Sequence, residues 1–209
     1  AYSGGINFFD TSRSKPESEK RLGAALHGIR QNVLLATKTA SQSVHEIRHD
    51  LDQSLDALEC DYVDLFQLEN PLVVPEKNGN DGIYNELLRM KDKGVIRHIG
   101  LATTDYEIAR KAVGTGLYET VQFPFSMISP DSVSAIVELC AEKDVGFIAM
   151  QPLNGGIVSD ISLGLGFFQQ YDNAVPVWGI HTQDELQQIL YFNNHPPVID
   201  DDFKKEIDR

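Results

Sequence analysis

Short apolar segments alternate with longer segments of helical periodicity along the whole chain. Strands are predicted where runs of roughly four to eight residues are rich in β-branched and aromatic side chains. These runs are residues 6–10, 33–38, 63–68, 95–101, 120–123, 146–150 and 174–177. Helices are predicted between these runs and after the last one, at residues 18–26, 43–58, 82–93, 106–113, 132–142, 161–171 and 182–191.

The helix predicted over residues 43–58 has the clearest periodicity. Ile47, Leu51, Leu55 and Leu58 recur at three- and four-residue intervals, so they lie on one face of a helix. Regular alternation of strands and helices predicts right-handed crossovers and a parallel sheet covered by helices. An open doubly wound sheet and a closed barrel both satisfy this pattern. The number of units favours an α/β fold of the parallel (β/α)8 TIM barrel type.

The beginning of the chain reads as an incomplete first unit of this barrel. Residues 1–5 resemble the end of a helix that a glycine terminates. We therefore predict a barrel whose first strand and helix lie outside this sequence. Residues 1–195 are assigned to the barrel, and residues 196–209, with two prolines and an acidic run, to a C-terminal extension or linker.

Composition narrows the classes of partner. The formal net charge of -13 argues against nucleic acid or an anionic membrane surface, because both require a cationic face. No apolar run approaches the roughly 18 residues of a membrane span. Cys60 and Cys140 have neither disulfide-framework nor zinc-site spacing, and the histidines show no metal-ligand pattern. We expect a cytoplasmic protein without a metal centre.

Charged residues stand at the ends of three successive predicted strands. Asp10, Lys38 and Glu69 end the first three apolar runs, and Thr103, Gln122 and Gln151 follow or end later ones. In a parallel α/β barrel these strand ends meet at the mouth, where the active site is built. A single charged residue can also simply mark where a strand leaves the core. Three in order favour a catalytic cluster.

Several segments together resemble the aldo/keto reductase family. Residues 5–11 (Gly-Ile-Asn-Phe-Phe-Asp-Thr), with Ser18-Glu19 and Leu22-Gly23, resemble the signature around the family's catalytic Asp, which corresponds to Asp10. Residues 35–38 resemble the segment with its catalytic Lys, which corresponds to Lys38, and residues 61–65 the start of the strand with its His. Residues 196–209 resemble the segment that precedes the ferredoxin-type tail of one branch, without the tail's cysteines, so no iron–sulfur centre is predicted.

The resemblance fails at two catalytic positions. The family's proton-donating Tyr is replaced by Lys15, which Pro16 follows, and its His is replaced by Glu69. A Glu at the His position is similar to the steroid double-bond reductases of the family, in which it makes the carbonyl a stronger electrophile. The resemblance therefore implies a catalytic set of Asp10, Lys15, Lys38 and Glu69 acting by general acid catalysis and oxyanion stabilisation.

The resemblance also implies a nicotinamide cofactor, either NADP or NAD, and a small-molecule carbonyl or enone substrate. Gln122 corresponds to the family's carboxamide-binding Gln, Thr103 belongs to a pair that replaces Ser-Asn, and Met150 replaces the ring-stacking Tyr. Glu185 stands where an Arg would pair with a 2′-phosphate. The remaining candidate cofactor-binding residues lie in the loops after the last two strands: Gln151, Leu153, Gly155, Gly179, His181 and Asp184.

Two hypotheses about function therefore remain open. The first is an oxidoreductase of aldo/keto reductase type with this non-standard catalytic set. The second is a barrel that has lost catalysis and acts as a binding or regulatory protein. Loss of the Tyr favours the second hypothesis, whereas the retained Asp10, Lys38 and Gln122 favour the first.

Overall fold

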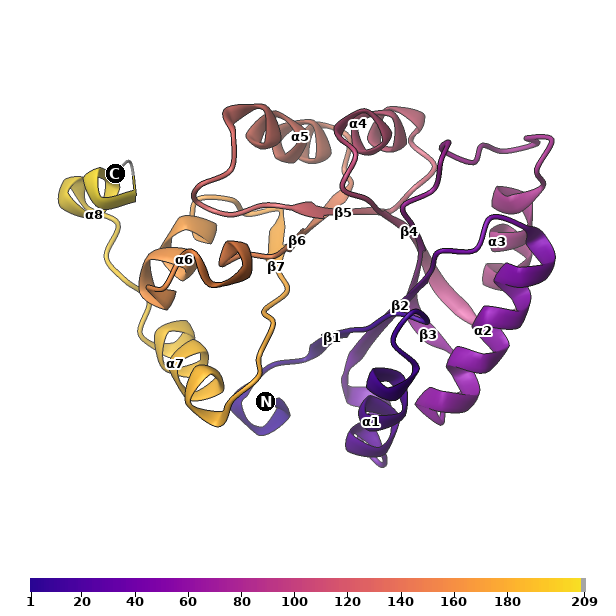
Figure 1. Cartoon of the computed structure of the whole chain (residues 1–209), viewed down its shortest axis with the longest axis horizontal. Helices are drawn as coiled ribbons and strands as arrows, with labels where there is room; N and C mark the ends of the chain where they lie inside the picture. The colour runs from indigo at the N-terminus through magenta and orange to yellow at the C-terminus, as the bar shows by residue number, and fades with distance from the viewer. Residues whose placement is uncertain (208–209) are drawn as a thin grey trace.

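The structure is a computed structural model that describes residues 1–207, and its centre is a curled parallel sheet (Figure 1). Within that range the sheet has seven strands in the order β1-β2-β3-β4-β5-β6-β7, so each strand pairs with its neighbours in sequence. The strands are β1 (Phe8–Asp10), β2 (Leu34–Thr39), β3 (Val63–Glu69), β4 (Ile96–Ala102), β5 (Thr120–Pro124), β6 (Gly146–Met150) and β7 (Ala174–Pro176). Every pairing is parallel, as predicted.

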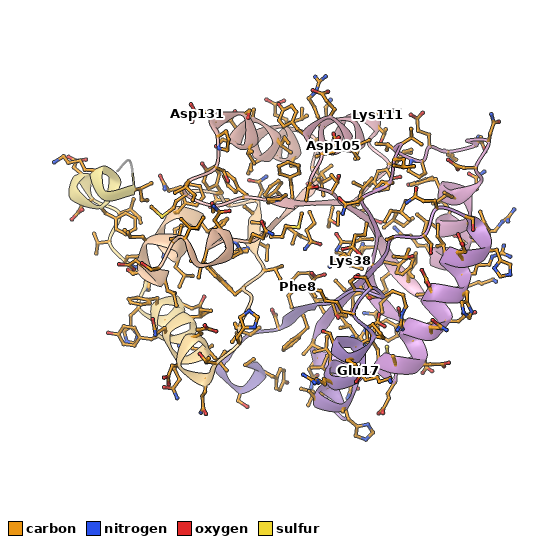
Figure 2. The ribbon with its side chains drawn as sticks, viewed as in Figure 1. Phe8, Glu17, Lys38, Asp105, Lys111 and Asp131 are labelled. Atoms are coloured by element: carbon orange, nitrogen blue, oxygen red, sulfur yellow. The ribbon has the colours of Figure 1, made fainter. Side chains whose placement is uncertain are left out.

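Helices follow the strands and cover the outer face of the curled sheet (Figure 1). They are α1 (Pro16–Leu26), α2 (Val44–Leu58), α3 (Ile83–Asp92), α4 (Tyr106–Thr115), α5 (Asp131–Glu142), α6 (Ile161–Phe168), α7 (Gln183–Asn194) and α8 (Asp201–Ile207). Three short 3₁₀ segments within the described range are η1 (Tyr2–Gly4), η2 (Arg30–Asn32) and η3 (Asn154–Gly156). Segment η1 ends at Gly5 in the left-handed conformation with φ 101°, as predicted for a glycine-terminated helix end over residues 1–5, whereas η2 and η3 were not predicted. In Figure 2, Lys38 and Phe8 lie inside the arc of strands, whereas Glu17, Lys111 and Asp131 lie on the outer helices.

The second helix shows how the sequence produces these elements. Ser43 caps α2 by accepting a hydrogen bond from the backbone N–H of Glu46, and Glu59 ends the helix in the left-handed conformation with φ 52°. The predicted apolar face is buried at Ile47, Leu51 and Leu58. Burial of each such side chain contributes roughly 1.5–3 kcal/mol to folding. Helix α2 is therefore held by its contact with the sheet and neighbouring helices more than by helix propensity.

The apolar side chains form two layers on opposite faces of the sheet. The larger layer lies between the strands and helices and includes Leu35, Phe66 and Phe147. The smaller layer fills the inside of the curl with Ala36, Leu65 and Ile148, against which Phe8 and Val177 pack. Because successive residues of a strand point to opposite faces, Asp10, Lys38 and Gln67 share the inner face with this smaller layer. The sequence thus places polar residues above an apolar floor inside the curl.

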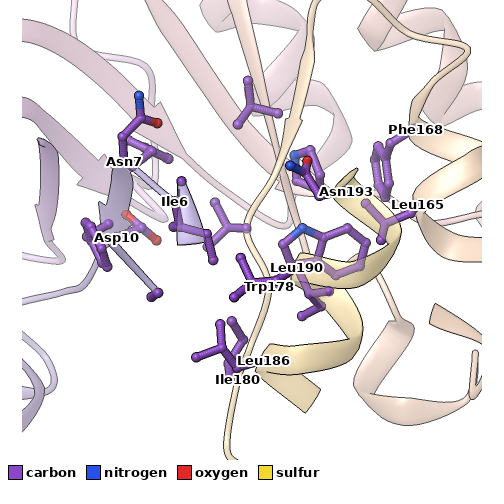
Figure 3. A pocket seen from close by; sticks show the side chains of 18 of the residues that line it. Ile6, Asn7, Asp10, Leu165, Phe168, Trp178, Ile180, Leu186, Leu190 and Asn193 are labelled. Carbon is purple, nitrogen blue, oxygen red and sulfur yellow. The ribbon is translucent and has the colours of Figure 1, made fainter. Parts of the chain in front are cut away.

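The sheet does not close, because β1 and β7 are the ends of the strand order rather than partners. Between these edges lies a cavity of about 950 Å³ lined by Ile6, Phe8 and Asp10 on one side and by Val175, Val177 and Trp178 on the other (Figure 3). An eight-stranded barrel has one more strand at this position. The prediction of a (β/α)8 barrel without its first unit is confirmed.

Element boundaries differ from the prediction at a few ends. Strand β1 begins at Phe8 instead of residue 6, because the backbone N–H of Ile6 bonds the carbonyl of Ala1 in the turn after η1. Helix α6 ends at Phe168, three residues before its predicted end. No helix in the described range combines the length and apolar character that a membrane span requires.

The C-terminal segment contains a helix that the sequence pattern did not predict. Helix α8 lies beside α6, and Phe203 occupies the space that a side chain at Gly166 would need. Ile207 also packs against the larger core layer. The predicted extension 196–209 therefore includes a packed helix, while its residues 208–209 lie outside the described range. The division between barrel and extension near residue 196 stays a prediction.

Candidate active site

A buried ion pair lies where β1 and β2 end. The Lys38 ammonium donates hydrogen bonds to Asp10 Oδ1 at 2.8 Å and Oδ2 at 2.6 Å, and a third to the carbonyl oxygen of Thr11 at 2.8 Å. The two charged side chains are only 9% and 8% exposed. Because the three bonds use all three hydrogens of the ammonium, Lys38 is held in one orientation. The predicted meeting of Asp10 and Lys38 is observed in the structure.

Two glutamines extend this pair across the inside of the sheet. Gln122 Nε2 donates to Asp10 Oδ2 at 3.1 Å, and Gln122 Oε1 accepts from Gln67 Nε2 at 2.7 Å. Both glutamines are buried. Gln67 Oε1 is buried without a hydrogen-bond partner among the described residues, which is costly for a polar atom unless a ligand or water satisfies it. Gln122 therefore fixes Asp10, and Gln67 leaves one acceptor available.

Glu69 joins the site through a hydroxyl group. Ser12 Oγ donates to Glu69 Oε2 at 2.8 Å, and Ser14 Oγ lies 2.7 Å from Ser12 Oγ. Ser12 is 4% exposed, Glu69 is half-buried and Ser14 is exposed. Glu69 makes no direct contact with Asp10 or Lys38 among the described hydrogen bonds and ion pairs. The third predicted charge thus belongs to the same mouth but to a separate hydrogen-bond chain.

A second buried carboxylate supports the loop that carries Asp10 and Ser12. Glu19 on α1 accepts hydrogen bonds from Thr37 Oγ1 at 2.8 Å and Ser54 Oγ at 2.6 Å, and it pairs with Arg13 at 2.5 Å. Glu19 itself has no exposed surface. The contacts of Glu19 connect the loop after β1 to β2 and α2. Packing on the side of the loop away from Glu69 therefore helps to fix the position of Ser12 beside Glu69.

The close approach of α1 to α2 makes that support possible. A side chain at Gly23 would lie 2.7 Å from the backbone oxygen of Ala57 and the carbonyl carbon of Leu58. Such a distance is incompatible with a Cβ atom, so only glycine permits this helix contact. The glycine of the Leu22-Gly23 segment is therefore required by the packing of α1 against α2.

Lys15 lies apart from the other predicted catalytic residues. It is exposed and occupies the N-cap of α1, where its backbone N–H bonds the carbonyl of Ser12. Its side chain makes no hydrogen bond or ion pair with any described residue. The loop geometry places Lys15 at the rim of the mouth, three residues from Ser12, with its ammonium in solvent.

The predicted nicotinamide-binding residues lie at the ends of β4, β5 and β6. Thr103 is buried and its hydroxyl accepts a bond from the backbone N–H of Asp105 at 3.1 Å. Met150 is half-buried, and Gln151 is exposed with a left-handed backbone, φ 56°. Leu153 N-caps η3, within which Gly155 has φ 68°. Several backbone amides of this loop are bonded within it, such as those of Asn154 to Gln151 and of Gly156 to Leu153, and its role in cofactor binding stays a prediction.

The other end of the predicted cofactor site lies at α7. Gly179, His181 and Asp184 are all exposed there. Glu185 forms a capping box with Thr182, and its carboxylate accepts the backbone N–H groups of His181 at 2.7 Å and Thr182 at 3.0 Å. These two bonds lower the pKa of Glu185. The carboxylate thus occupies two backbone amides before α7 that a phosphate could otherwise bind.

Sequence reasoning missed Ser12, Ser14 and Gln67 as members of the site. The three were passed over because hydroxyl and amide side chains are common at the ends of strands. Ser12 was nevertheless recognisable, because it follows Asp10 by two residues in a loop at the mouth. Gln67 precedes Glu69 by two residues and so points to the same face of β3.

The fold and the site together define a parallel α/β barrel with a buried ion pair at the mouth formed by its strand ends. A sequence model of the aldo/keto reductase family matches residues 1–164. The chain belongs to the aldo/keto reductase family.

Curated relatives agree with this assignment. The chain is 28% identical over 173 residues to a probable aldo-keto reductase 1 of Glycine max, and this match covers 75% of this chain and 48% of the relative. It is 24% identical over 172 residues to an uncharacterized oxidoreductase of Bacillus subtilis, with 75% of this chain and 54% of that protein covered. The chain spans about half the length of the curated relatives it matches.

Solved structures confirm the fold over nearly the whole chain. The holo form of the aldo-keto reductase AKR11C1 from Bacillus halodurans matches with a TM-score of 0.85 and 19% identity, covering 99% of this chain and 83% of that one. An aldo/keto reductase from Klebsiella pneumoniae in complex with NADP and acetate matches with a TM-score of 0.84 and 17% identity, covering 99% and 81%.

Proposed function

We propose that this chain carries the catalytic groups of an oxidoreductase that transfers hydride between a nicotinamide cofactor and a carbonyl or enone substrate. The observation that carries the proposal is the buried pair of Asp10 and Lys38, held at 2.6 Å at the mouth of the barrel. Burying two charges costs several kcal/mol for each ion before their attraction is counted. Such a pair at the functional end of the barrel is better explained by chemistry than by stability.

Each charged group has a distinct role in the proposed reaction. The cofactor, when bound, supplies the hydride. Asp10 holds Lys38, whose positive charge stabilises the negative charge that develops on the substrate oxygen. Two acids are candidates for the proton that this oxygen receives, namely Lys15, at the position of the family's Tyr, and Glu69, at the position of its His. Glu69 in its acid form would also make the substrate carbonyl a stronger electrophile.

The described residues fit the nicotinamide end of a cofactor better than its phosphate end. Gln67 Oε1 is a buried acceptor without a partner, and an amide N–H such as that of a carboxamide would satisfy it. Thr103 and half-buried Met150 lie at neighbouring strand ends, and a thioether can lie on the face of a ring. Gln151, Leu153 and the backbone at Gly155 would complete this side.

The phosphate end would rest on loop and helix amides. Gly179 and His181 precede α7 and Asp184 lies in its first turn, where the N–H groups that Glu185 does not occupy would favour an anion. The Klebsiella pneumoniae relatives are complexed with NADP and with NADPH. We therefore propose NADP or NAD as the cofactor. Because Cys60 and Cys140 are both free thiols, we also propose a reducing, cytoplasmic setting.

The test is single-turnover oxidation of bound reduced cofactor by a reactive aldehyde in the full-length protein. We expect slow oxidation, because loss of a general acid typically costs about a hundredfold to ten-thousandfold in rate. Lys15→Tyr should raise the rate by supplying a phenol as proton donor at the position of the family's Tyr. A natural protein that is fast and slows on receiving the tyrosine would show that Lys15 already supplies the proton.

The exposed position of Lys15 also favours the alternative, a barrel that binds but does not turn over. Its ammonium has no described partner that would hold it against a substrate. Calorimetric titration with NADPH and NADH separates the two functions. Binding without any cofactor oxidation, in both the natural protein and Lys15→Tyr, would support the binding or regulatory protein.

A further inference from the structure

We propose that Ser12 and Ser14 form a two-hydroxyl path that carries protons from solvent to Glu69, and that Glu69 is the group that protonates the substrate oxygen. This inference rests on the proposed function and names the proton route of the same site. Ser12 contacts Glu69 and Ser14 contacts Ser12, so both act as relay residues and neither touches the reacting atoms.

The donors and acceptors around Ser12 fix the direction of the path. The single Ser12 hydroxyl hydrogen can serve Glu69 Oε2 at 2.8 Å or the carbonyl oxygen of Lys38 at 3.5 Å, and the shorter bond to a carboxylate is the stronger one. Ser12 Oγ is then an acceptor for Ser14 Oγ at 2.7 Å and for the backbone N–H of Ser14 at 3.2 Å. Hydrogen bonds therefore run from Ser14 through Ser12 to Glu69.

Burial gives this path its two ends. Ser12 is 4% exposed and Glu69 is half-buried, whereas Ser14 is exposed. A proton can thus enter at Ser14 from water and pass Ser12 without water entering the buried part of the mouth. The support of Arg13 by Glu19 holds the residue between the two serines, so both hydroxyls keep their spacing.

Lys38 and Lys15, the two predicted catalytic cations, are poorly placed to donate the proton. All three hydrogens of Lys38 are bonded to Asp10 and Thr11, and deprotonation would leave Asp10 as a buried charge without its partner. Lys15 is exposed at the rim. Glu69 is the remaining predicted catalytic acid that other residues hold within the mouth.

The proposed step balances as follows. The Glu69 carboxylate takes a proton from Ser12, Ser12 takes one from Ser14, and Ser14 takes one from a hydronium ion of the solvent. The substrate oxygen would then gain this proton from Glu69 as the carbonyl carbon gains the hydride that the reduced nicotinamide supplies. The products are an alcohol, the oxidised nicotinamide and water.

Two measurements on the full-length protein test the path. The first is infrared difference spectroscopy of the cofactor-free protein, with the Glu69 carboxylate band assigned by Glu69→Gln. Ser12→Ala should shift this band because it removes the hydrogen bond to Oε2, and Ser12→Thr should restore it. Ser14→Ala should leave the band in place, since Ser14 does not touch Glu69.

The second measurement is the single-turnover rate of cofactor oxidation. Ser12→Ala and Ser14→Ala should each slow it by about tenfold to a hundredfold, with cofactor affinity unchanged, and the threonine variants should restore it. Ser129→Ala is the matched control. Its hydroxyl also accepts a loop backbone N–H, that of Ser126 at 2.9 Å, but it lies outside the Glu69 chain.

The outcomes separate the path from the proposed function. Full activity in both alanine variants would overturn the path while leaving the oxidoreductase intact. An unshifted Glu69 band in Ser12→Ala would overturn it as well, whatever the activity. A natural protein that oxidises no cofactor would overturn the proposed function and the path's catalytic role together, even if the infrared band confirms the contact of Ser12 with Glu69.

Discussion

The two sides of the barrel mouth are built differently. On the side of β1, β2 and β3, the central ion pair is buried and fixed by neighbours, since Lys38 is bonded to Asp10 and to Thr11. On the side of β6 and α7, the candidate residues are mostly exposed and lie in loops with left-handed backbone, such as Gln151 and Gly155. On the first side, packing sets the positions of the site residues. On the second side, backbone amides and the start of a helix set them.

This contrast follows the needs of the two proposed tasks. Stabilising charge on a reacting oxygen requires groups that do not reorient, because reorientation would cost the energy that they should supply. Holding a long cofactor requires several weak contacts spread over its length. The departures from the family that the sequence analysis predicts nevertheless fall on both sides, at Lys15 and Glu69 on the first and at Glu185 on the second.

The largest expected effect tests whether the first side depends on its ion pair. Lys38→Met should lower the free energy of unfolding by about 3–5 kcal/mol, because it leaves the Asp10 carboxylate buried without its partner. Chemical denaturation measures this loss. Lys91→Met is the control, since its pair with Glu119 is 38% and 37% exposed and should cost under about 1 kcal/mol. Equal losses in the two variants would contradict the distinction.

The next effect concerns the support that Glu19 gives to the loop after β1. Glu19→Gln keeps an acceptor for Thr37 and Ser54 but removes the charge opposite Arg13, so stability should fall by about 1.5–3 kcal/mol. Thermal or urea unfolding would show it. Glu17→Gln, on the same helix but exposed and paired only with Lys20, should leave stability unchanged. A Glu17 effect as large as that of Glu19 would mean that α1 charge, rather than the buried contact, matters.

A smaller effect probes the second side. Glu185→Arg should tighten binding of NADPH relative to NADH by up to about fivefold, as a cation replaces an anion near the expected 2′-phosphate. Calorimetry at fixed ionic strength gives both constants. Gln187→Arg, one exposed position on the same helix, separates this from a general gain in positive charge. A natural protein that already binds NADPH far more tightly would show that cations outside residues 1–207 serve the phosphate.

The smallest effect is the response of α7 to acid. Hydrogen bonds from His181 and Thr182 lower the pKa of Glu185 below 4.5 in the folded protein, so its capping contribution is complete above the unfolded value and is lost as the pH falls through the folded value. The amide proton shifts of His181 and Thr182 should therefore titrate together below about pH 4.5. Shifts that stay constant through this range would contradict the assignment of the two bonds to Glu185.

Much of the fold and part of the site were predictable from the sequence. The strands and helices were found because both periodicities are regular, and Asp10 and Lys38 were found because strand ends of a parallel barrel meet. The hydrogen bond between Gln67 and Gln122 was not predicted, because the resemblance to the family assigned Gln122 to a cofactor carboxamide. Helix α8 was missed because its contact with α6 depends on Gly166, far away in sequence.

The role of Glu185 as a helix cap could have been predicted from the sequence but was not. Thr182 followed three residues later by Glu185 is a capping-box pattern, which assigns that carboxylate to the start of α7. The Ser12 to Glu69 contact, by contrast, joins residues 57 apart in the chain. The register of β1, β2 and β3 brings Ser12 and Glu69 together. A local sequence pattern contains no information about contacts between residues so far apart in the chain.

Trp178 gives the open edge of the sheet its own optical signal. It is the protein's single tryptophan, it lines the cavity between β1 and β7, and its ring stands edge-on to Phe168 with centroids 6.0 Å apart. Its emission will therefore report the polarity of this cavity. A polypeptide strand that fills the cavity should move the emission to shorter wavelength, so completion of the barrel can be followed in unlabelled protein by fluorescence alone.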